Sequence, residues 1–111
     1  MAHLIGHVSG TVISTVDQLQ DIMDRIATVC NFNVVARAFH QFEPQGATGV
    51  LVLSESHFSA HTYPEFGKVY IDVFCCSKDF NPDECARHIE RYFGGRGEWQ
   101  VVMRSVNDQV E

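Results

Sequence analysis

The sequence predicts a single α+β domain, a two-layer α/β sandwich in which two helices cover one face of a mainly antiparallel sheet. Three observations lead to this fold class. The chain has 111 residues, enough for one core and too few for a second domain. Two segments carry apolar residues at helical spacing, whereas the others are short and rich in Val, Ile and Phe. Because two helices cannot cover both faces of such a sheet, one face is expected to stay open.

The N-terminal part of the chain is expected to form a strand, a helix and a second strand. Alternating and β-branched residues over positions 4–13 predict the first strand. Thr15 and Gln18 then form a T-x-x-Q capping box, which predicts the start of an amphipathic helix over about 16–30. Positions 32–42 are rich in Val and Phe and predict the second strand, which the turn residues EPQG close.

The middle of the chain is expected to contribute three more strands, over 47–54, 57–63 and 68–76, with a turn at the sequence PEFG. The last of these has two different faces. The apolar face, expected to lie under the helices, consists of Val69, Ile71, Val73 and Cys75. The other face consists of Tyr70, Asp72, Phe74 and Cys76. A face that is part apolar and part reactive is usually covered by a partner subunit or lines a ligand site, so a homodimer is expected.

The C-terminal part is expected to form a second helix and a last strand. Asn81 is the predicted N-cap, Pro82 takes the first helical position, and Gly94 ends the helix. Positions 98–105 predict the strand, and the final six residues are expected to be frayed.

Composition excludes several classes of protein. The net charge is -6 and the eight Lys and Arg residues are scattered, which argues against nucleic-acid binding. No apolar run approaches the roughly 20 residues of a membrane helix, and the N-terminus lacks the features of a signal peptide. A cytoplasmic protein without membrane contact is therefore expected. The four cysteines form no C-x-x-C pair and are interpreted as thiols.

The segment LSESHFSAHTYPE, residues 53–65, holds an unusual number of reactive side chains for a strand. His57 and His61 are four residues apart, roughly 13 Å in a strand, so they cannot share a metal ion, and no metal site is expected. The serines lack the Gly-x-Ser-x-Gly frame of a hydrolase nucleophile. From spacing alone, the segment is a polar-faced strand that meets solvent or a subunit.

A resemblance changes this interpretation. The segment ESHFSAHTYPE resembles the processing site of bacterial and archaeal S-adenosylmethionine decarboxylase proenzymes, which are pyruvoyl-dependent. The flanking sequences FHQFEPQGATGVLVLSESH and VYIDVFCC are similar to the family pattern in the same order and spacing. The resemblance is strong over about 39–76 and loose elsewhere.

The resemblance implies that the chain cuts itself between Glu55 and Ser56. The Ser56 hydroxyl would attack the Glu55 carbonyl to give an ester, and β-elimination would release a β chain of residues 1–55. The dehydroalanine left at the start of the α chain, residues 56–111, would hydrolyse to a pyruvoyl cofactor. That carbonyl would form a Schiff base with the substrate amine and accept the electron pair left by departing CO₂.

The resemblance also assigns the residues that assist. His61 matches the processing histidine, and Thr48 matches a hydroxyl residue that is often serine in the family. Cys76 matches the acid that reprotonates the substrate α-carbon. Phe42 and Tyr63 match aromatic residues that bind the substrate, although the family usually has Trp at the position of Tyr63. Glu65 matches a carboxylate that holds ribose hydroxyls.

The implied activity is decarboxylation of S-adenosylmethionine, which supplies aminopropyl groups for spermidine synthesis. Two alternatives stay open at this point. The first is an ornithine or arginine decarboxylase of the same superfamily, because the substrate pocket departs from the family pattern. The second is a non-catalytic ligand-binding sandwich domain, in which Ser56 would remain an ordinary serine.

Overall fold

A computed structural model describes residues 1–105, so the expectation for the final six residues lies outside the described part. Within these residues the chain forms six strands, two α-helices and one short 3₁₀ helix. In chain order the elements are β1 (Ala2–Ser9), α1 (Val16–Val29), β2 (Val34–Gln41), β3 (Ala47–Leu53), β4 (Ser56–Tyr63), η1 (Pro64–Phe66), β5 (Lys68–Cys75), α2 (Pro82–Phe93) and β6 (Arg96–Met103).

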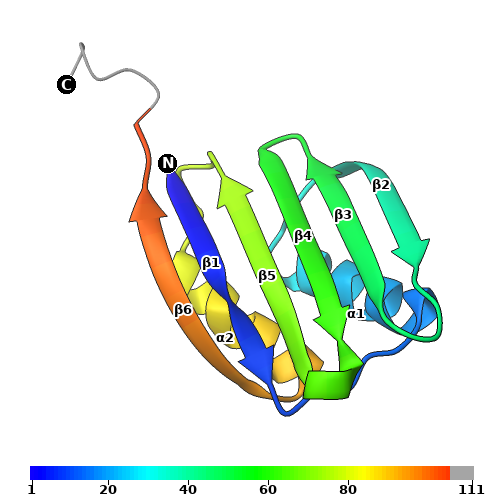
Figure 1. The fold of residues 1–111 in the computed structure, drawn as a ribbon. Helices are drawn as coiled ribbons and strands as arrows, with labels where there is room; N and C mark the ends of the chain where they lie inside the picture. The colour runs from blue at the N-terminus through cyan, green and yellow to red at the C-terminus, as the bar shows by residue number, and fades with distance from the viewer. Residues whose placement is uncertain (106–111) are drawn as a thin grey trace.

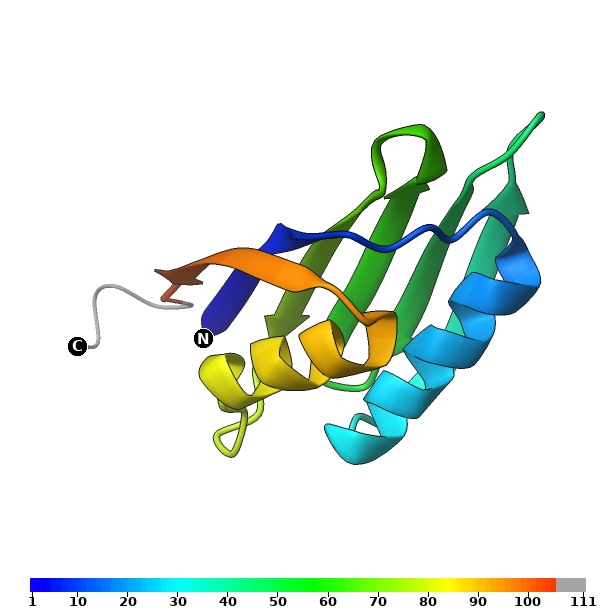
Figure 2. The same cartoon turned by 90° about the horizontal axis from the view of Figure 1, so that it is seen from below.

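The strands form one sheet with the order β2-β3-β4-β5-β1-β6, and every neighbouring pair is antiparallel. Figure 1 shows β1 inserted between β5 and β6, so the first strand of the chain lies inside the sheet. Seen from below, α1 and α2 lie side by side on the same face, and no helix formed by residues 1–105 covers the opposite face (Figure 2). The predicted two-layer sandwich with one open face is confirmed.

Both helices begin where the sequence predicts. Thr15 Oγ1 accepts a hydrogen bond from the Gln18 backbone N–H at 3.2 Å, and the Gln18 side chain accepts one from the Thr15 N–H at 3.1 Å. This is the predicted capping box, which satisfies two N–H groups that the first helical turn leaves unpaired. Asn81 Oδ1 caps α2 by accepting from the Glu84 N–H at 3.1 Å. Gly94 ends α2 at a φ of 78°, which favours glycine.

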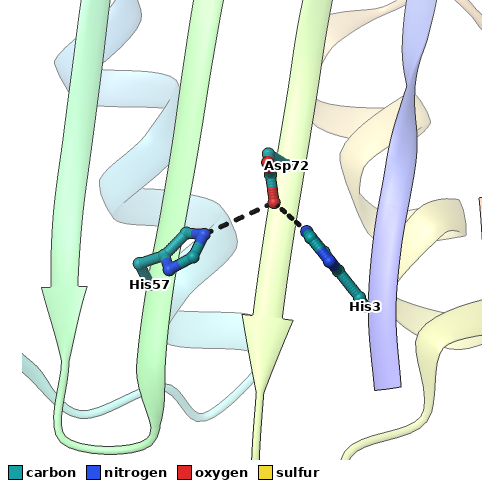
Figure 3. A group of neighbouring side chains, drawn as sticks. All are labelled: His3, His57 and Asp72. Carbon is teal, nitrogen blue, oxygen red and sulfur yellow. Dashed lines mark hydrogen bonds and ion pairs between the residues drawn. The ribbon is translucent and has the colours of Figure 1, made fainter. Parts of the chain in front are cut away.

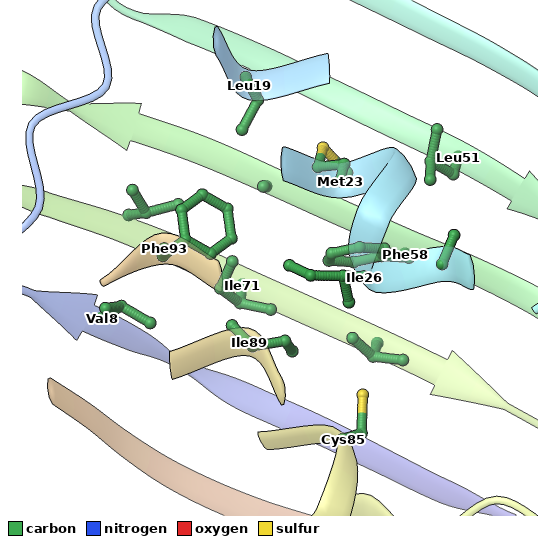
Figure 4. Packing of buried hydrophobic residues seen from close by; sticks show 14 of the residues in the cluster. Val8, Leu19, Met23, Ile26, Leu51, Phe58, Ile71, Cys85, Ile89 and Phe93 are labelled. Carbon is green, nitrogen blue, oxygen red and sulfur yellow. The ribbon is translucent and has the colours of Figure 1, made fainter. Parts of the chain in front are cut away.

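The core lies between the helices and the covered face of the sheet (Figure 4). Its fully buried side chains come from both layers and include Leu19, Met23, Ile26, Leu51, Phe58 and Ile89. Alternation along β5 agrees with the sequence prediction, since Val69, Ile71, Val73 and Cys75 are all buried. The residues between them, Tyr70, Asp72 and Phe74, therefore lie on the open face of the sheet.

Two strand ends differ from the prediction. The first strand ends at Ser9 and not near position 13, because Gly10 turns the chain at a φ of 84°. The N–H groups of Gly10 and Thr11 both donate to the Gly67 carbonyl, at 2.8 and 3.2 Å. Thr11, the first β-branched residue after the turn, therefore bonds to a loop and not to a strand. The last strand is shifted two residues toward the N-terminus, and β5 ends at Cys75, one residue before Cys76.

Among residues 1–105, no helix is long and apolar enough to cross a membrane.

Candidate active site

The predicted cleavage site lies at a hairpin turn. β3 and β4 are joined by the two turn residues Ser54 and Glu55, with Leu53 and Ser56 paired on either side. Two-residue hairpin loops usually place positive φ angles on the loop residues themselves. In this chain the positive φ, 155°, belongs instead to Ser56. Residues other than glycine rarely adopt this angle, so backbone strain is located directly after the Glu55–Ser56 peptide bond.

The carbonyl of that bond has a backbone donor. The Cys76 N–H donates to the Glu55 carbonyl oxygen at 3.0 Å. A donor in this position can stabilise the negative charge that develops when a nucleophile attacks the carbonyl carbon. The side chain of Glu55 points elsewhere, because it accepts from the Ser54 hydroxyl at 2.7 Å. This hydrogen bond lowers the pKa of Glu55 below its ordinary value.

The two adjacent cysteines have different surroundings. Cys75 is buried under the helices, and burial raises the pKa of its thiol. Cys76 lies just beyond the end of β5 and is exposed. Only Cys76 is therefore accessible to a bound substrate. The burial of Cys75 agrees with the sequence prediction of a covered thiol, and Cys76 is exposed although it lies beyond the strand that was expected to hold it.

The other predicted site residues gather at the far end of β4. A pocket of about 270 Å³ is lined by Phe42, Thr48, His61, Tyr63 and Glu65, together with Gln45, Gly46 and Thr62. Thr48 Oγ1 lies 2.9 Å from His61 Nδ1, and the two residues are partners in the register of β3 with β4. The predicted processing pair and the three predicted substrate-binding residues thus share one pocket.

The two groups are well separated within one copy of the chain. Ser56 and His61 are five residues apart on β4, roughly 16 Å at 3.3 Å per residue. The register also pairs Ser56 with buried Cys75 and Leu53, whereas His61 pairs with Tyr70 on the open face. One copy therefore does not bring His61 to the Ser56 hydroxyl. The predicted site is divided into a cleavage half, with Glu55, Ser56 and Cys76, and a pocket half around His61.

One group of reactive residues was missed by sequence reasoning. His3 Nε2 and His57 Nε2 lie 2.5 and 3.4 Å from the same oxygen of Asp72, Oδ1 (Figure 3). The sequence argument tested His57 only against His61. His3 joins the group because β1 pairs with β5, and nothing local in the sequence indicates that pairing. The four cysteines, all within the described residues, are thiols as predicted.

Comparisons with known proteins agree with the resemblance. The sequence profile of the family described as S-adenosylmethionine decarboxylase matches residues 2–105. An S-adenosylmethionine decarboxylase proenzyme of Symbiobacterium thermophilum is 44% identical over 93 residues, which cover 84% of this chain and 70% of the relative. A proenzyme of the same name from Syntrophomonas wolfei is 35% identical over 113 residues, with coverages of 98% and 90%.

A solved structure has the same fold. The crystal structure of the adenosylmethionine decarboxylase from Aquifex aeolicus VF5 superposes with a TM-score of 0.87 at 27% sequence identity. The match covers 97% of this chain and 92% of that one. The family profile spans nearly the whole described chain, and the relatives are similar over most of their length. The chain belongs to the S-adenosylmethionine decarboxylase family.

Proposed function

We propose that this chain is a self-processing decarboxylase of S-adenosylmethionine, which provides aminopropyl groups for spermidine synthesis. The observation that carries the proposal is the arrangement at the hairpin turn. A serine with a strained φ angle follows a carbonyl that accepts a hydrogen bond from the Cys76 N–H. A ligand-binding domain has no need of this arrangement, whereas a chain that cuts its own peptide bond does.

The residues at the turn account for the first step of cleavage. The Ser56 hydroxyl is the nucleophile, and the Glu55 carbonyl carbon is its target. As the tetrahedral centre forms, the Cys76 N–H holds the developing oxyanion. Conversion of the amide to an ester breaks the C–N bond and relieves the unfavourable backbone angle at Ser56. The local strain therefore favours the shift.

A second copy of the chain is needed to supply His61. The spacing of roughly 16 Å exceeds the reach of an imidazole, so the proton transfers at Ser56 require a His61 from elsewhere. A two-fold homodimer formed through the open face would place the pocket half of one copy beside the cleavage half of the other, and the reverse. This face exposes large apolar side chains, namely Ile5, Val52, Tyr63 and Tyr70. Their exposure supports a buried role in a dimer.

The residues at position 56 and around it fit a pyruvoyl group made from the chain itself. The precursor is a serine, and its own backbone angle carries the strain at the turn. The group would supply an electron sink for the loss of CO₂. Cys76 is exposed and its backbone N–H bonds to Glu55, which supports its thiol as the group that delivers a proton to the substrate α-carbon.

The pocket supports S-adenosylmethionine as the substrate. Phe42 and Tyr63 offer aromatic faces for an adenine ring and for the sulfonium cation. Glu65 offers a carboxylate that can accept hydrogen bonds from ribose hydroxyls and attract the cation. Ornithine and arginine have neither a base nor a ribose to occupy these groups. The cytoplasmic location and the absence of a nucleic-acid partner stay predictions from the sequence.

Two measurements on the purified protein test the proposal. Intact mass under denaturing conditions should show two fragments that meet at Glu55 and Ser56, the second beginning with a pyruvoyl group. The Ser56→Ala variant is the control and should remain one chain. The cleaved protein should then release CO₂ from S-adenosylmethionine and not from ornithine or arginine. A wild-type chain that stays whole after long incubation would support the non-catalytic alternative, and activity on a basic amino acid alone would reassign the substrate.

A further inference from the structure

Three side chains that the proposed reaction does not use converge on the open face of the sheet. Figure 3 shows His57 from β4, Asp72 from β5 and His3 from β1 pointing toward one another. One ligand atom from each lies within 4.8 Å of the other two. We propose that His3, His57 and Asp72 form a binding site for a divalent transition-metal ion such as Zn²⁺ or Co²⁺. This revises the expectation, drawn from His57 and His61 alone, that the protein has no metal site.

The donor set and its spacing suit such an ion. Two imidazole nitrogens and one carboxylate oxygen are ligands that Zn²⁺ and Co²⁺ accept readily, with a fourth position left to water. Bonds of about 2.0 to 2.1 Å in a tetrahedron put neighbouring ligand atoms roughly 3.3 Å apart. His57 Nε2 and Asp72 Oδ1 are already 3.4 Å apart. His3 Nε2 is 2.5 Å from the same oxygen and must withdraw by about 0.8 Å to reach the tetrahedral spacing.

The sheet holds the three residues in place. The register puts His3 and His57 on either side of Phe74, and Asp72 lies two residues before Phe74 on the same face of β5. The Phe74 ring centroid lies 5.4 Å from that of His3 and 6.0 Å from that of His57, which restricts both imidazoles. The side chains of His57 and Asp72 are 40% and 42% exposed in a single copy, so an ion can reach them before the proposed dimer covers this face. Ligands on three adjacent strands make a more rigid site than ligands on a loop.

One neighbouring cation competes with the metal. The Arg104 guanidinium lies 3.4 Å from His3 Nδ1 and 4.9 Å from the centre of the Phe74 ring. Arginine can only donate, so in this contact Nδ1 accepts and Nε2 is the ring nitrogen that donates to Asp72. A metal ion needs the lone pair of Nε2. Binding therefore moves that proton to Nδ1 and releases Arg104, which means that Arg104 lowers the affinity of the site.

The proposal does not depend on self-cleavage or decarboxylation, because it is tested by binding. Purified full-length protein, first treated with a chelator, is titrated with Co²⁺ while its visible absorption is followed, and Zn²⁺ is then used as a competitor. One ion per chain should bind in a four-coordinate site. His57→Ala and Asp72→Asn should each weaken binding by at least tenfold, since each removes a ligand. His88→Ala is the matched control, because His88 lies on α2 and away from the cluster, and it should bind like the wild type.

The Arg104→Gln variant provides a second test, because it is expected to raise the affinity for the metal ion, whereas the ligand variants lower it. This variant removes the competing charge and replaces the guanidinium with a shorter, neutral amide, so its affinity should rise several-fold above that of the wild type. Because a misfolded chain would expose buried thiols that also bind metal ions, the gain is measured on a variant that circular dichroism shows to be folded. This keeps the proposal falsifiable if the ligand variants are poorly folded. The proposal is overturned if the wild type binds no ion in competition with a weak chelator. It is also overturned if His57→Ala and Asp72→Asn bind as tightly as the wild type while circular dichroism shows them folded.

Discussion

The division of the site between two copies can be tested by mixing two variants that each fail alone. His61→Ala keeps the Ser56 nucleophile but lacks the histidine that handles protons. Ser56→Ala keeps His61 but has no nucleophile. Because Ser56 and His61 lie roughly 16 Å apart along β4, a copy cannot use its own histidine. A Ser56→Ala copy should therefore restore cleavage of a His61→Ala copy bound to it.

The expected yield follows from symmetry. When the two variants are co-expressed in equal amounts and pair at random, about half of the His61→Ala chains have a Ser56→Ala partner. That half should be cleaved, and the rest should remain whole because loss of a general acid or base slows a reaction by about 10²- to 10⁴-fold. Different affinity tags on the two chains allow mixed dimers to be purified, and denaturing mass spectrometry counts the fragments.

Two results would refute this reasoning. Cleavage of the His61→Ala chain alone at the wild-type rate would mean that His61 has no role at Ser56. Mixed dimers that form but contain no cleaved His61→Ala chain would mean that the histidine does not act across the interface. Co-expression of His61→Ala with the double variant Ser56→Ala/His61→Ala is the control, and it should yield whole chains only.

Three further predictions test single residues. Cys76→Ala should leave cleavage intact, because the backbone N–H remains, but lower the rate of CO₂ release by about 10²- to 10⁴-fold; full turnover would require a different acid. Thr48→Val removes the hydroxyl that contacts His61 and should slow cleavage in a mass-spectrometric time course, whereas Thr48→Ser should not; equal rates would remove Thr48 from the proposed mechanism. Phe58→Ala, at a fully buried position, should lower the free energy of unfolding in urea by about 3 to 5 kcal/mol. Phe66→Ala, at a side chain that is 73% exposed, should change it by less than about 0.5 kcal/mol, and similar losses for both would contradict the observed core.

The fold could be predicted because its signals are local. The capping box at Thr15 and the cap at Asn81 each lie within four residues of the helix they start. The end of the first strand could not be predicted in the same way. Thr11 and its β-branched neighbours favour a strand, but the chain leaves the sheet because Gly10 and Thr11 donate to Gly67, far along the sequence. Strand boundaries therefore depend on partners that a local pattern does not contain.

The same distinction between local signals and contacts distant in sequence applies to the site. The contact between Thr48 and His61 follows from one hairpin and its alternation, so the family pattern and the geometry agree there. The cluster of His3 with Asp72 spans 69 positions and depends on β1 entering the sheet beside β5. The spacing of five residues in a strand already implies that Ser56 and His61 are far apart. Only the structure shows that His61 lines the pocket of the predicted substrate-binding residues and that Ser56 does not.

The order of strands in the sheet determines how the two fragments stay associated after the proposed cleavage. The fragment 1–55 would hold β1, β2 and β3, and the fragment from residue 56 would hold β4, β5 and β6. Three of the five strand pairs in the sheet join a strand of one fragment to a strand of the other. These pairs are β3 with β4, β5 with β1, and β1 with β6. The two fragments could therefore separate only if these three strand pairs of the sheet were broken. The uncut chain would then be the template on which both pieces fold, and pieces made separately would each lack the neighbours their strands require.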